Sequence, residues 1–335
     1  MEFAVLLGAL VVILLGAETF TNALEHLGER LGISEGVTGS IFAAVGTALP
    51  ETMVPIFAIL SGTGSIEVRH EVGIGAILGA PLMLSTLSLF LMGAFAASRR
   101  GWKGLLRPER TGLSRDLLWF SVAFGLGVLA ALLPADWMLA RGSMAVMLTL
   151  LYGMYLFLTI QASAQLVNEG HGTEADRSLY LTRIGLPNHL GMVLGQLAIG
   201  FVLIMFGAKG FVYGIEHLAK WLGISALSLS VLIIPVATEL PEKVNSILWI
   251  RRGRDTLAFG NITGAMVFQG SLLPALGILL TPWVPQREVV IGMVITLIAA
   301  VYLLVMVRCR TLRVYHLVIN GLCYLGFCLS VVMGQ

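Results

Sequence analysis

Long apolar runs separated by short polar stretches make up most of the chain. A helix that crosses a membrane needs about 20 mostly apolar residues. Ten segments meet this requirement: 3–27, 36–60, 72–98, 117–134, 138–160, 190–216, 225–250, 257–281, 288–307 and 314–333. The pattern therefore predicts an all-α polytopic membrane protein with ten transmembrane helices.

One long polar stretch, residues 161–189, separates the first five segments from the last five. The predicted domain organisation is a five-helix repeat at 1–160, a connecting loop at 161–189 and a second five-helix repeat at 190–335. Because five is an odd number, the second repeat must enter the membrane in the opposite orientation to the first.

The two halves also share sequence. Residues 15–59 and 206–250 align without a gap, and the Glu-His-Leu, Leu-Gly-Ile-Ser and Leu-Pro-Glu strings match in register. Shared apolar composition does not place three polar-containing strings at one common offset. Inverted repeats with interrupted helices and a binding site near the membrane midplane are typical of secondary transporters.

Composition excludes several classes of protein. Hydrophobic residues make up 57% of the chain and charged residues only 12%, whereas an average soluble domain carries about 25% charged residues. This excludes a soluble enzyme. The net charge of +2 and the scattered basic residues exclude a nucleic-acid-binding protein. The expected partners are membrane lipids and inorganic cations, and the chain is expected to be a monomer.

The basic residues predict an orientation in the membrane, because short cytoplasmic loops are enriched in Lys and Arg. If the N-terminus lies outside, 15 of the 21 basic residues fall in cytoplasmic loops and 4 in outside loops. The largest cluster runs from Arg99 to Arg115. We therefore expect a multi-pass protein of the cell membrane with both termini outside and a cytoplasmic central loop.

Two glutamates lie near the middle of apolar segments. Glu51 follows Pro50 in segment 36–60, and Glu242 follows Pro241 in segment 225–250. An ionisable side chain at this depth costs about 3 kcal/mol on insertion scales and usually faces a partner or an aqueous cavity. Inverted repeats would bring the two carboxylates together, which suits a hard cation. The alternative is a structural hydrogen bond between helices.

The prolines supply further oxygen ligands. A proline cannot donate to the carbonyl four residues earlier and pushes that carbonyl aside. Carbonyls freed in this way can coordinate cations where they line a cavity. The candidate ligands of this kind, together with hydroxyls one turn from the glutamates, are Gly46, Thr47, Ala237 and Thr238.

Glu239 and Lys243 share a helical sector with Glu242, because the three residues are spaced three and four apart. Glu239 is either a third ligand carboxylate or the partner of Lys243 in an internal ion pair. Lys243 in turn modulates the site or occupies it. The sequence leaves these alternatives open.

Polar residues in segment 257–281 add neutral candidates. Asn261 and Gln269 lie eight residues apart on one helical face. The matching positions of segment 72–98 are Ala76 and Leu84, which offer no ligand side chain. Outside this site, we expect Lys209 and Glu18 to line an aqueous entrance or to extend toward the membrane surface.

The segments GTALPE (46–51) and ATELPE (237–242) resemble the two alpha-repeat motifs of the cation/calcium exchanger superfamily, close to its prokaryotic sodium/calcium exchangers. The resemblance covers nearly the whole chain. It implies that Glu51 and Glu242 bind calcium, that Thr47 and Thr238 bind calcium and sodium, and that the first and sixth helices move. The family pattern G-N-x-x-G-S-N is only partly kept, since the serine position is Ala265.

The resulting hypothesis is a secondary active cation antiporter that exchanges calcium for sodium or protons by alternating access. Two alternatives remain: a proton-coupled exchanger of another cation, and a non-transporting membrane cation sensor with Lys243 in the cation site. No enzymatic activity is expected, because the chain lacks a His-Glu-x-x-His motif, a Ser/His pair and paired cysteines. No cofactor is expected beyond the transported ions themselves.

Overall fold

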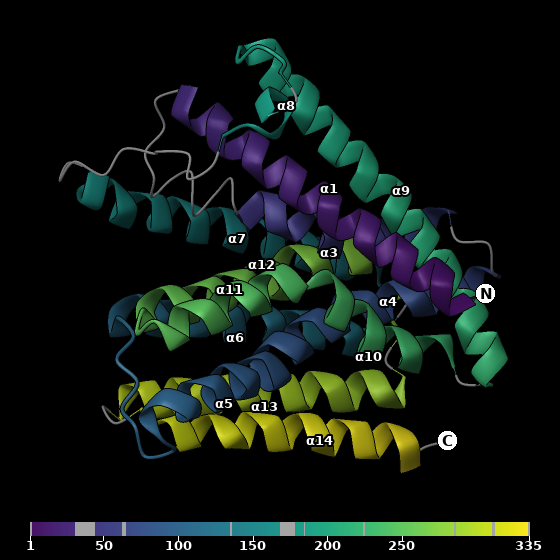
Figure 1. Ribbon diagram of the computed structural model, residues 1–335. Coiled ribbons are helices and arrows are strands. Elements are labelled where there is room, and N and C mark those ends of the chain that lie inside the picture. Colours follow the sequence, from purple (N-terminus) through teal and green to yellow (C-terminus); the bar gives the residue numbers. More distant parts are fainter. Residues whose placement is uncertain are drawn as a thin grey trace.

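The computed structural model describes residues 2–30, 44–61, 65–134, 136–167, 178–183, 185–223, 225–284, 286–309 and 312–333. Within these ranges the chain forms helices joined by short connections (Figure 1). The helices of the first half are α1 (Glu2–Arg30), α3 (Ala44–Ser61), α4 (Ile66–Met83), α5 (Leu89–Arg100), α6 (Arg110–Leu132) and α7 (Met138–Val167).

The second half begins with the short helix α8 (Tyr180–Arg183). The helices that follow are α9 (Leu190–Leu222), α10 (Ala226–Thr238), α11 (Leu240–Arg251), α12 (Asp255–Leu280), α13 (Arg287–Arg308) and α14 (Leu317–Met333). A π-helical turn, η2 (Leu84–Ser88), joins α4 to α5, and a 3₁₀ turn, η3 (Val314–His316), precedes α14. The all-helical prediction is confirmed for the described residues.

Eight helical stretches of the described chain are long and apolar enough to cross a membrane. They correspond to predicted segments one, three to six and eight to ten. The other two predicted segments contain shorter apolar helices, Leu49–Ser61 and Leu227–Val236. The fold is therefore a multi-pass helical bundle with eight candidate spans.

Helices α1 and α9 lie side by side and cover one face of the bundle (Figure 1). They are antiparallel, because Leu6 of α1 contacts Gly214 whereas Phe20 contacts Gly200. A Cβ atom on Gly207 would lie 2.9 Å from the backbone nitrogen of Ile13. Small residues of this kind allow membrane helices to approach each other closely. On the opposite side of the bundle, α5, α13 and α14 pack together.

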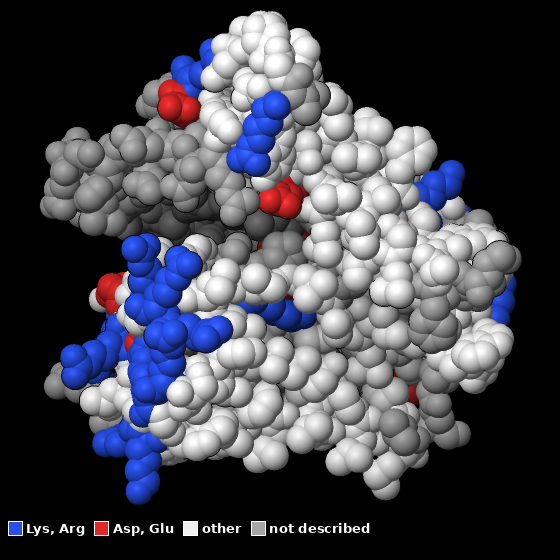
Figure 2. Space-filling model, viewed as in Figure 1, with Lys and Arg blue, Asp and Glu red and all other residues white. Residues whose placement is uncertain are grey.

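The connections rich in Arg and Lys gather at one end of the bundle (Figure 2). Arg100 forms an ion pair of 2.6 Å with Asp255, which joins the end of α5 to the start of α12. The nitrogen of Leu106 donates to the carbonyl of Leu312 over 3.0 Å, which adds the connection before α14. Both chain termini lie at the other end (Figure 1).

Candidate cation-binding site

Helix α10 ends at Thr238 and helix α11 begins at Leu240, so the helical path is interrupted at Glu239. Pro241 stands in the first turn of α11 and has no N–H, so the carbonyl of Ala237 loses its donor four residues ahead. The single helix predicted over 225–250 is thus divided in two at Glu239. In the first half α3 runs as one helix through Pro50 and Pro55.

Three buried carboxylates act on one another electrostatically near this interruption. Glu51 of α3 and Glu242 of α11 are each 3% exposed, and Glu239 is fully buried. Their charges interact with one another and with Lys243. That Glu51 and Glu242 share one cation site stays a prediction, and their electrostatic interaction is compatible with it.

Several buried oxygens in this region accept no hydrogen bond from any described residue. They are both carboxylate oxygens of Glu51 and Oε1 of Gln269. Buried polar atoms are normally hydrogen-bonded, and an exception calls for a ligand or another explanation. Oxygen acceptors without donors have the chemistry of a site for a hard cation.

Lys243 lies inside this group of acceptors. Its Nζ atom donates to the carbonyl oxygen of Pro235 over 3.0 Å and lies 3.7 Å from Oε2 of Glu239. The same Pro235 carbonyl also accepts from the nitrogen of Glu239. Of the two roles left open for Glu239, the structure contains the ion pair.

The polar residues of α12 divide into two kinds. Asn261 donates from Nδ2 to the carbonyl of Glu242 over 3.1 Å and to Oγ of Ser246 over 3.0 Å, so it fastens α12 to α11. Gln269 is buried and its side chain faces Glu239. Gln269 is thus placed as a candidate ligand, whereas the amide nitrogen of Asn261 holds the helix that carries Glu242.

The other predicted ligands lie near the end of α10 and the start of α3. Thr238 is buried and donates its hydroxyl to the carbonyl of Ile234 over 3.1 Å. Gly46 and Thr47 lie in the first turn of α3, and Ala237 lies in the last turn of α10; the side chains of these three lie outside the described part. Among the described residues, no three acidic, His or Cys side chains are grouped closely enough to hold one metal ion.

Sequence analysis missed a group of buried hydroxyls in the third apolar segment. Ser85, Thr86 and Ser88 lie in the π-helical turn that follows Pro81. Asn320 of α14 donates to the carbonyl of Ser85 over 2.8 Å and so satisfies a backbone group of this turn. The available signal was the run Ser-Thr-Leu-Ser after a proline, since such turns often mark functional positions in helices.

Asp116 was also missed, because the fourth segment was predicted to start at residue 117. The helix α6 begins earlier, at Arg110, where Glu109 accepts hydrogen bonds from the nitrogens of Thr111 and Gly112 over 2.6 Å each. Asp116 is therefore inside the bundle. It accepts the hydroxyls of Tyr155 and Thr263 over 3.1 Å and 2.9 Å.

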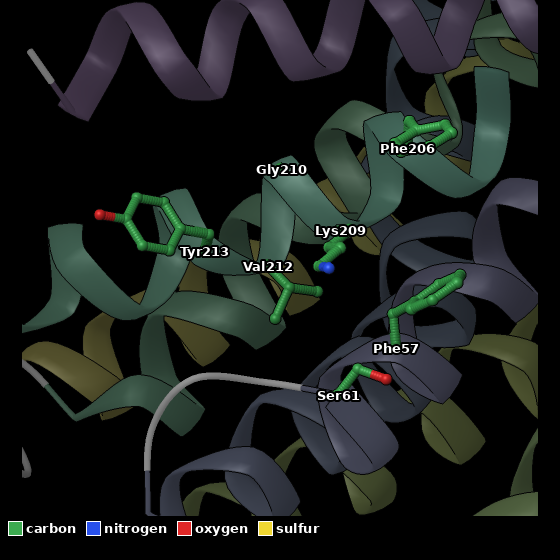
Figure 3. A pocket seen from close by; sticks show the side chains of 7 residues that line it. All are labelled: Phe57, Ser61, Phe206, Lys209, Gly210, Val212 and Tyr213. Atoms are coloured by element: carbon green, nitrogen blue, oxygen red, sulfur yellow. The ribbon is translucent and has the colours of Figure 1, made fainter.

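A pocket of about 330 Å³ opens between α3 and α9 (Figure 3). Its lining residues are Phe57, Ser61, Phe206, Lys209, Gly210, Val212 and Tyr213. Lys209 thus lines a largely aromatic and aliphatic pocket whose lining includes none of the three carboxylates. Glu18, the matching residue of α1, accepts the hydroxyl of Tyr180 over 2.7 Å.

Comparisons with known proteins agree with this architecture. The family described as sodium/calcium exchanger protein matches residues 1–161 and 192–333. The sodium/calcium exchanger MaX1 of Methanosarcina acetivorans is 24% identical over 289 residues, which cover 79% of each chain.

Two solved structures share the fold. The H⁺/Ca²⁺ exchanger CAX superimposes with a TM-score of 0.75 at 16% identity, over 99% of this chain and 82% of the other. The sodium-calcium exchanger NCX_Mj gives 0.59 at 19% identity, over 99% and 97%. The proteins that it resembles are named as exchangers rather than enzymes, and this chain belongs to the sodium/calcium exchanger protein family.

Proposed function

We propose that this protein is a secondary active antiporter that moves calcium in exchange for sodium ions or protons. The observation that carries the proposal is the burial of Glu51 and Glu242, whose carboxylates act on each other electrostatically. Each follows a Leu-Pro pair in one of two matching sequence segments, and each is buried. Both Glu51 oxygens accept no hydrogen bond from the described residues, so a cation would satisfy them.

The coupling ion is proposed as sodium or protons, because the relatives differ on this point. MaX1 is named a sodium/calcium exchanger and CAX an H⁺/Ca²⁺ exchanger. The proposed calcium ligands are Glu51 and Glu242, supported by oxygens of Thr47, Thr238, Gly46 and Ala237 and by the side chains of Gln269, Asn261 and Glu239. We propose no further cofactor.

The proposed architecture is ten crossings in two inverted repeats, 1–160 and 190–335. Antiparallel packing of α1 on α9 supports it, because these helices come from matching positions of the two halves. No three acidic, His or Cys side chains in the described chain are grouped as a metal site. Calcium binds oxygen ligands at 2.3–2.6 Å, so we propose that the ligands close around the ion during an alternating-access cycle. The proposed moving pair is α1 and α9.

The proposed orientation has both termini outside and the central loop in the cytoplasm. Both termini lie at one end of the bundle, and the basic connections lie at the other (Figures 1 and 2). Basic connections facing the cytoplasm would also meet anionic lipid headgroups. In this proposal the protein works as a monomer whose partners are lipids and inorganic cations.

One observation favours a second candidate, a non-transporting cation sensor. Lys243 already places a positive charge among the carboxylates, as it would in a permanently occupied site. A proton-coupled exchanger of another cation is the remaining alternative. Measurement of ion flux distinguishes a sensor from either exchanger.

The experiment is uptake of radioactive calcium into vesicles that contain the purified protein. One set of vesicles is loaded with sodium and another with acidic buffer. Both are diluted into a calcium buffer of neutral pH that contains no sodium. We expect uptake above that of protein-free vesicles in at least one arm, and competition tests with other divalent cations then establish selectivity. Protein that binds calcium but gives no flux in either arm would support the sensor instead.

A further inference from the structure

Lys209 is an exposed cation within a candidate membrane span. It lies in α9, in the apolar stretch Leu190–Leu222 that is long enough to cross a membrane. None of the ion pairs or hydrogen bonds between described residues involves its ammonium group. A charged side chain in a span is costly and usually has a partner. The described part of the chain supplies no anion to Lys209, so an anion from its surroundings can take that place.

The pocket beside Lys209 has the walls of a ligand site. Its volume of about 330 Å³ falls within the range of small-molecule sites, which are mostly apolar with a few polar groups. Figure 3 shows the Lys209 nitrogen directed toward α3, between Phe57 and Val212. The ring of Phe206 is 71% exposed and forms another wall. One cation therefore faces a space that is otherwise lined mainly by aromatic and aliphatic groups.

Polar and apolar groups follow the same order along both helices. Phe57 lies four residues before Ser61 in α3, and Phe206 lies three residues before Lys209 in α9, which is about one helical turn in each case. Both rings lie on the same side of Lys209 and Ser61 (Figure 3). Helix α3 ends at Ser61, so the polar layer lies toward the end of an apolar helix. Membrane lipids have this order too, with a polar headgroup followed by apolar chains.

We propose that this pocket binds an anionic membrane phospholipid. Its phosphate accepts hydrogen bonds from Lys209 and Ser61, and an acyl chain packs against Phe57 and Phe206. The phosphate complements the charge of the ammonium group, as it does at other basic sites on membrane proteins. A zwitterionic lipid is the weaker ligand, because its headgroup carries a second cation that Lys209 repels. The bound lipid bridges α3 and α9.

The test places a fluorescent reporter in the pocket. In F206W of the full chain an indole replaces the exposed ring, and bromine atoms on a neighbouring acyl chain quench its fluorescence. Wild-type protein gives the background from the native tryptophans. The vesicles contain equal parts of phosphatidylglycerol, which is anionic, and phosphatidylcholine, which is zwitterionic. Only the first lipid is brominated in one set and only the second in the other, so both sets have the same surface charge.

A hydrogen bond to a charged group changes binding by about 10-fold or more. We therefore expect brominated phosphatidylglycerol to occupy the pocket of F206W about 10-fold more often than brominated phosphatidylcholine. K209M/F206W should be quenched equally by the two lipids, and K209R/F206W should keep the preference because it keeps the charge. The matched control is K220M/F206W, because Lys220 is an exposed lysine near the end of α9 and does not line the pocket.

Equal quenching of F206W by the two brominated lipids would overturn the proposal, and this comparison leaves Lys209 in place. A correctly inserted K209M/F206W that keeps the preference would overturn it as well. So would loss of the preference in K220M/F206W, because the effect would then come from general surface charge. Calcium flux is not among the readouts, so the result does not depend on the proposed function.

Discussion

Gln196 of α9 donates a hydrogen bond from Nε2 to Oδ1 of Asn22 in α1, over 2.9 Å. Both residues are buried, and the same Gln196 nitrogen also donates to the carbonyl of Thr19. The nitrogen of Tyr180 donates to Asn22 and that of Leu181 donates to Oε1 of Gln196, which attaches the segment after the central stretch to both helices. These bonds, together with glycine contacts along the rest of the pair, join α1 and α9 into one unit.

The first prediction follows from this joint unit. Gly210 and Ala9 face each other so closely that a Cβ atom on Gly210 would lie 3.4 Å from that of Ala9, near the Cβ separation of a disulfide. We expect oxidised A9C/G210C to retain most of its calcium flux, because the two helices move together. Sliding of one helix along the other would instead require flux to stop on oxidation and return on reduction.

The background for this cross-link needs the native thiols removed. Cys309, Cys323 and Cys328 are free cysteines. They should be replaced by alanine first, and each single-cysteine variant then serves as a control for oxidation that does not join the helices.

The second prediction concerns the two motif glutamates. Removing one partner from a buried charge site costs about 3–5 kcal/mol, so E51Q and E242Q should each weaken calcium binding by about 100-fold or more. Calcium titration of purified protein and flux into vesicles measure the two effects. Near-normal flux in a correctly inserted variant would remove that glutamate from the site.

The third prediction tests the Glu239–Lys243 pair. The atoms Nζ and Oε2 lie 3.7 Å apart inside the protein, so the two residues should act on cation affinity together. A double-mutant cycle with E239Q, K243M and their combination should give a coupling energy of about 0.5–3 kcal/mol. E239Q alone should impair binding most, because it leaves an unpaired ammonium beside the cation. Additive effects would show that the pair does not exist in the working protein.

The fourth prediction concerns Asp116. Its carboxylate accepts hydroxyls from Tyr155 of α7 and Thr263 of α12, so it ties three helices together. D116A leaves two buried hydroxyls without their acceptor and should destabilise the protein by about 1–3 kcal/mol. Thermal unfolding in detergent measures the loss. D136A is the control, because Asp136 is exposed and its removal should change stability by about 0.5 kcal/mol or less.

The fifth prediction concerns orientation. With both termini outside, a C-terminal reporter that is active only in the periplasm or exterior should give signal, and one that is active only in the cytoplasm should not. A reporter inserted between Gly101 and Leu105 should show the reverse, since this connection belongs to the basic end of the bundle. The opposite pair of signals would invert the proposed topology.

The sequence by itself was sufficient for the class of protein and for a hypothesis on where its chemistry lies. Apolar runs of membrane length are visible without a structure, because lipid imposes the same length on every crossing. The matching Leu-Pro-Glu strings identified Glu51 and Glu242, because buried charge in a membrane is rare and costly. Pro241 predicts that the Ala237 carbonyl lacks its helical donor, since the missing N–H is a property of the residue itself.

Tertiary structure decided which groups each polar side chain meets. Helical spacing put Glu239, Glu242 and Lys243 in one sector, but only the placed backbone shows the ammonium at Pro235 and Glu239. Asn261 is a candidate ligand by sequence, and only the placed backbone shows that its amide nitrogen also binds α11. The spacing of residues along a helix determines which side chains share one face. The neighbour on that face depends on how distant helices pack, and the chain order alone does not specify that packing.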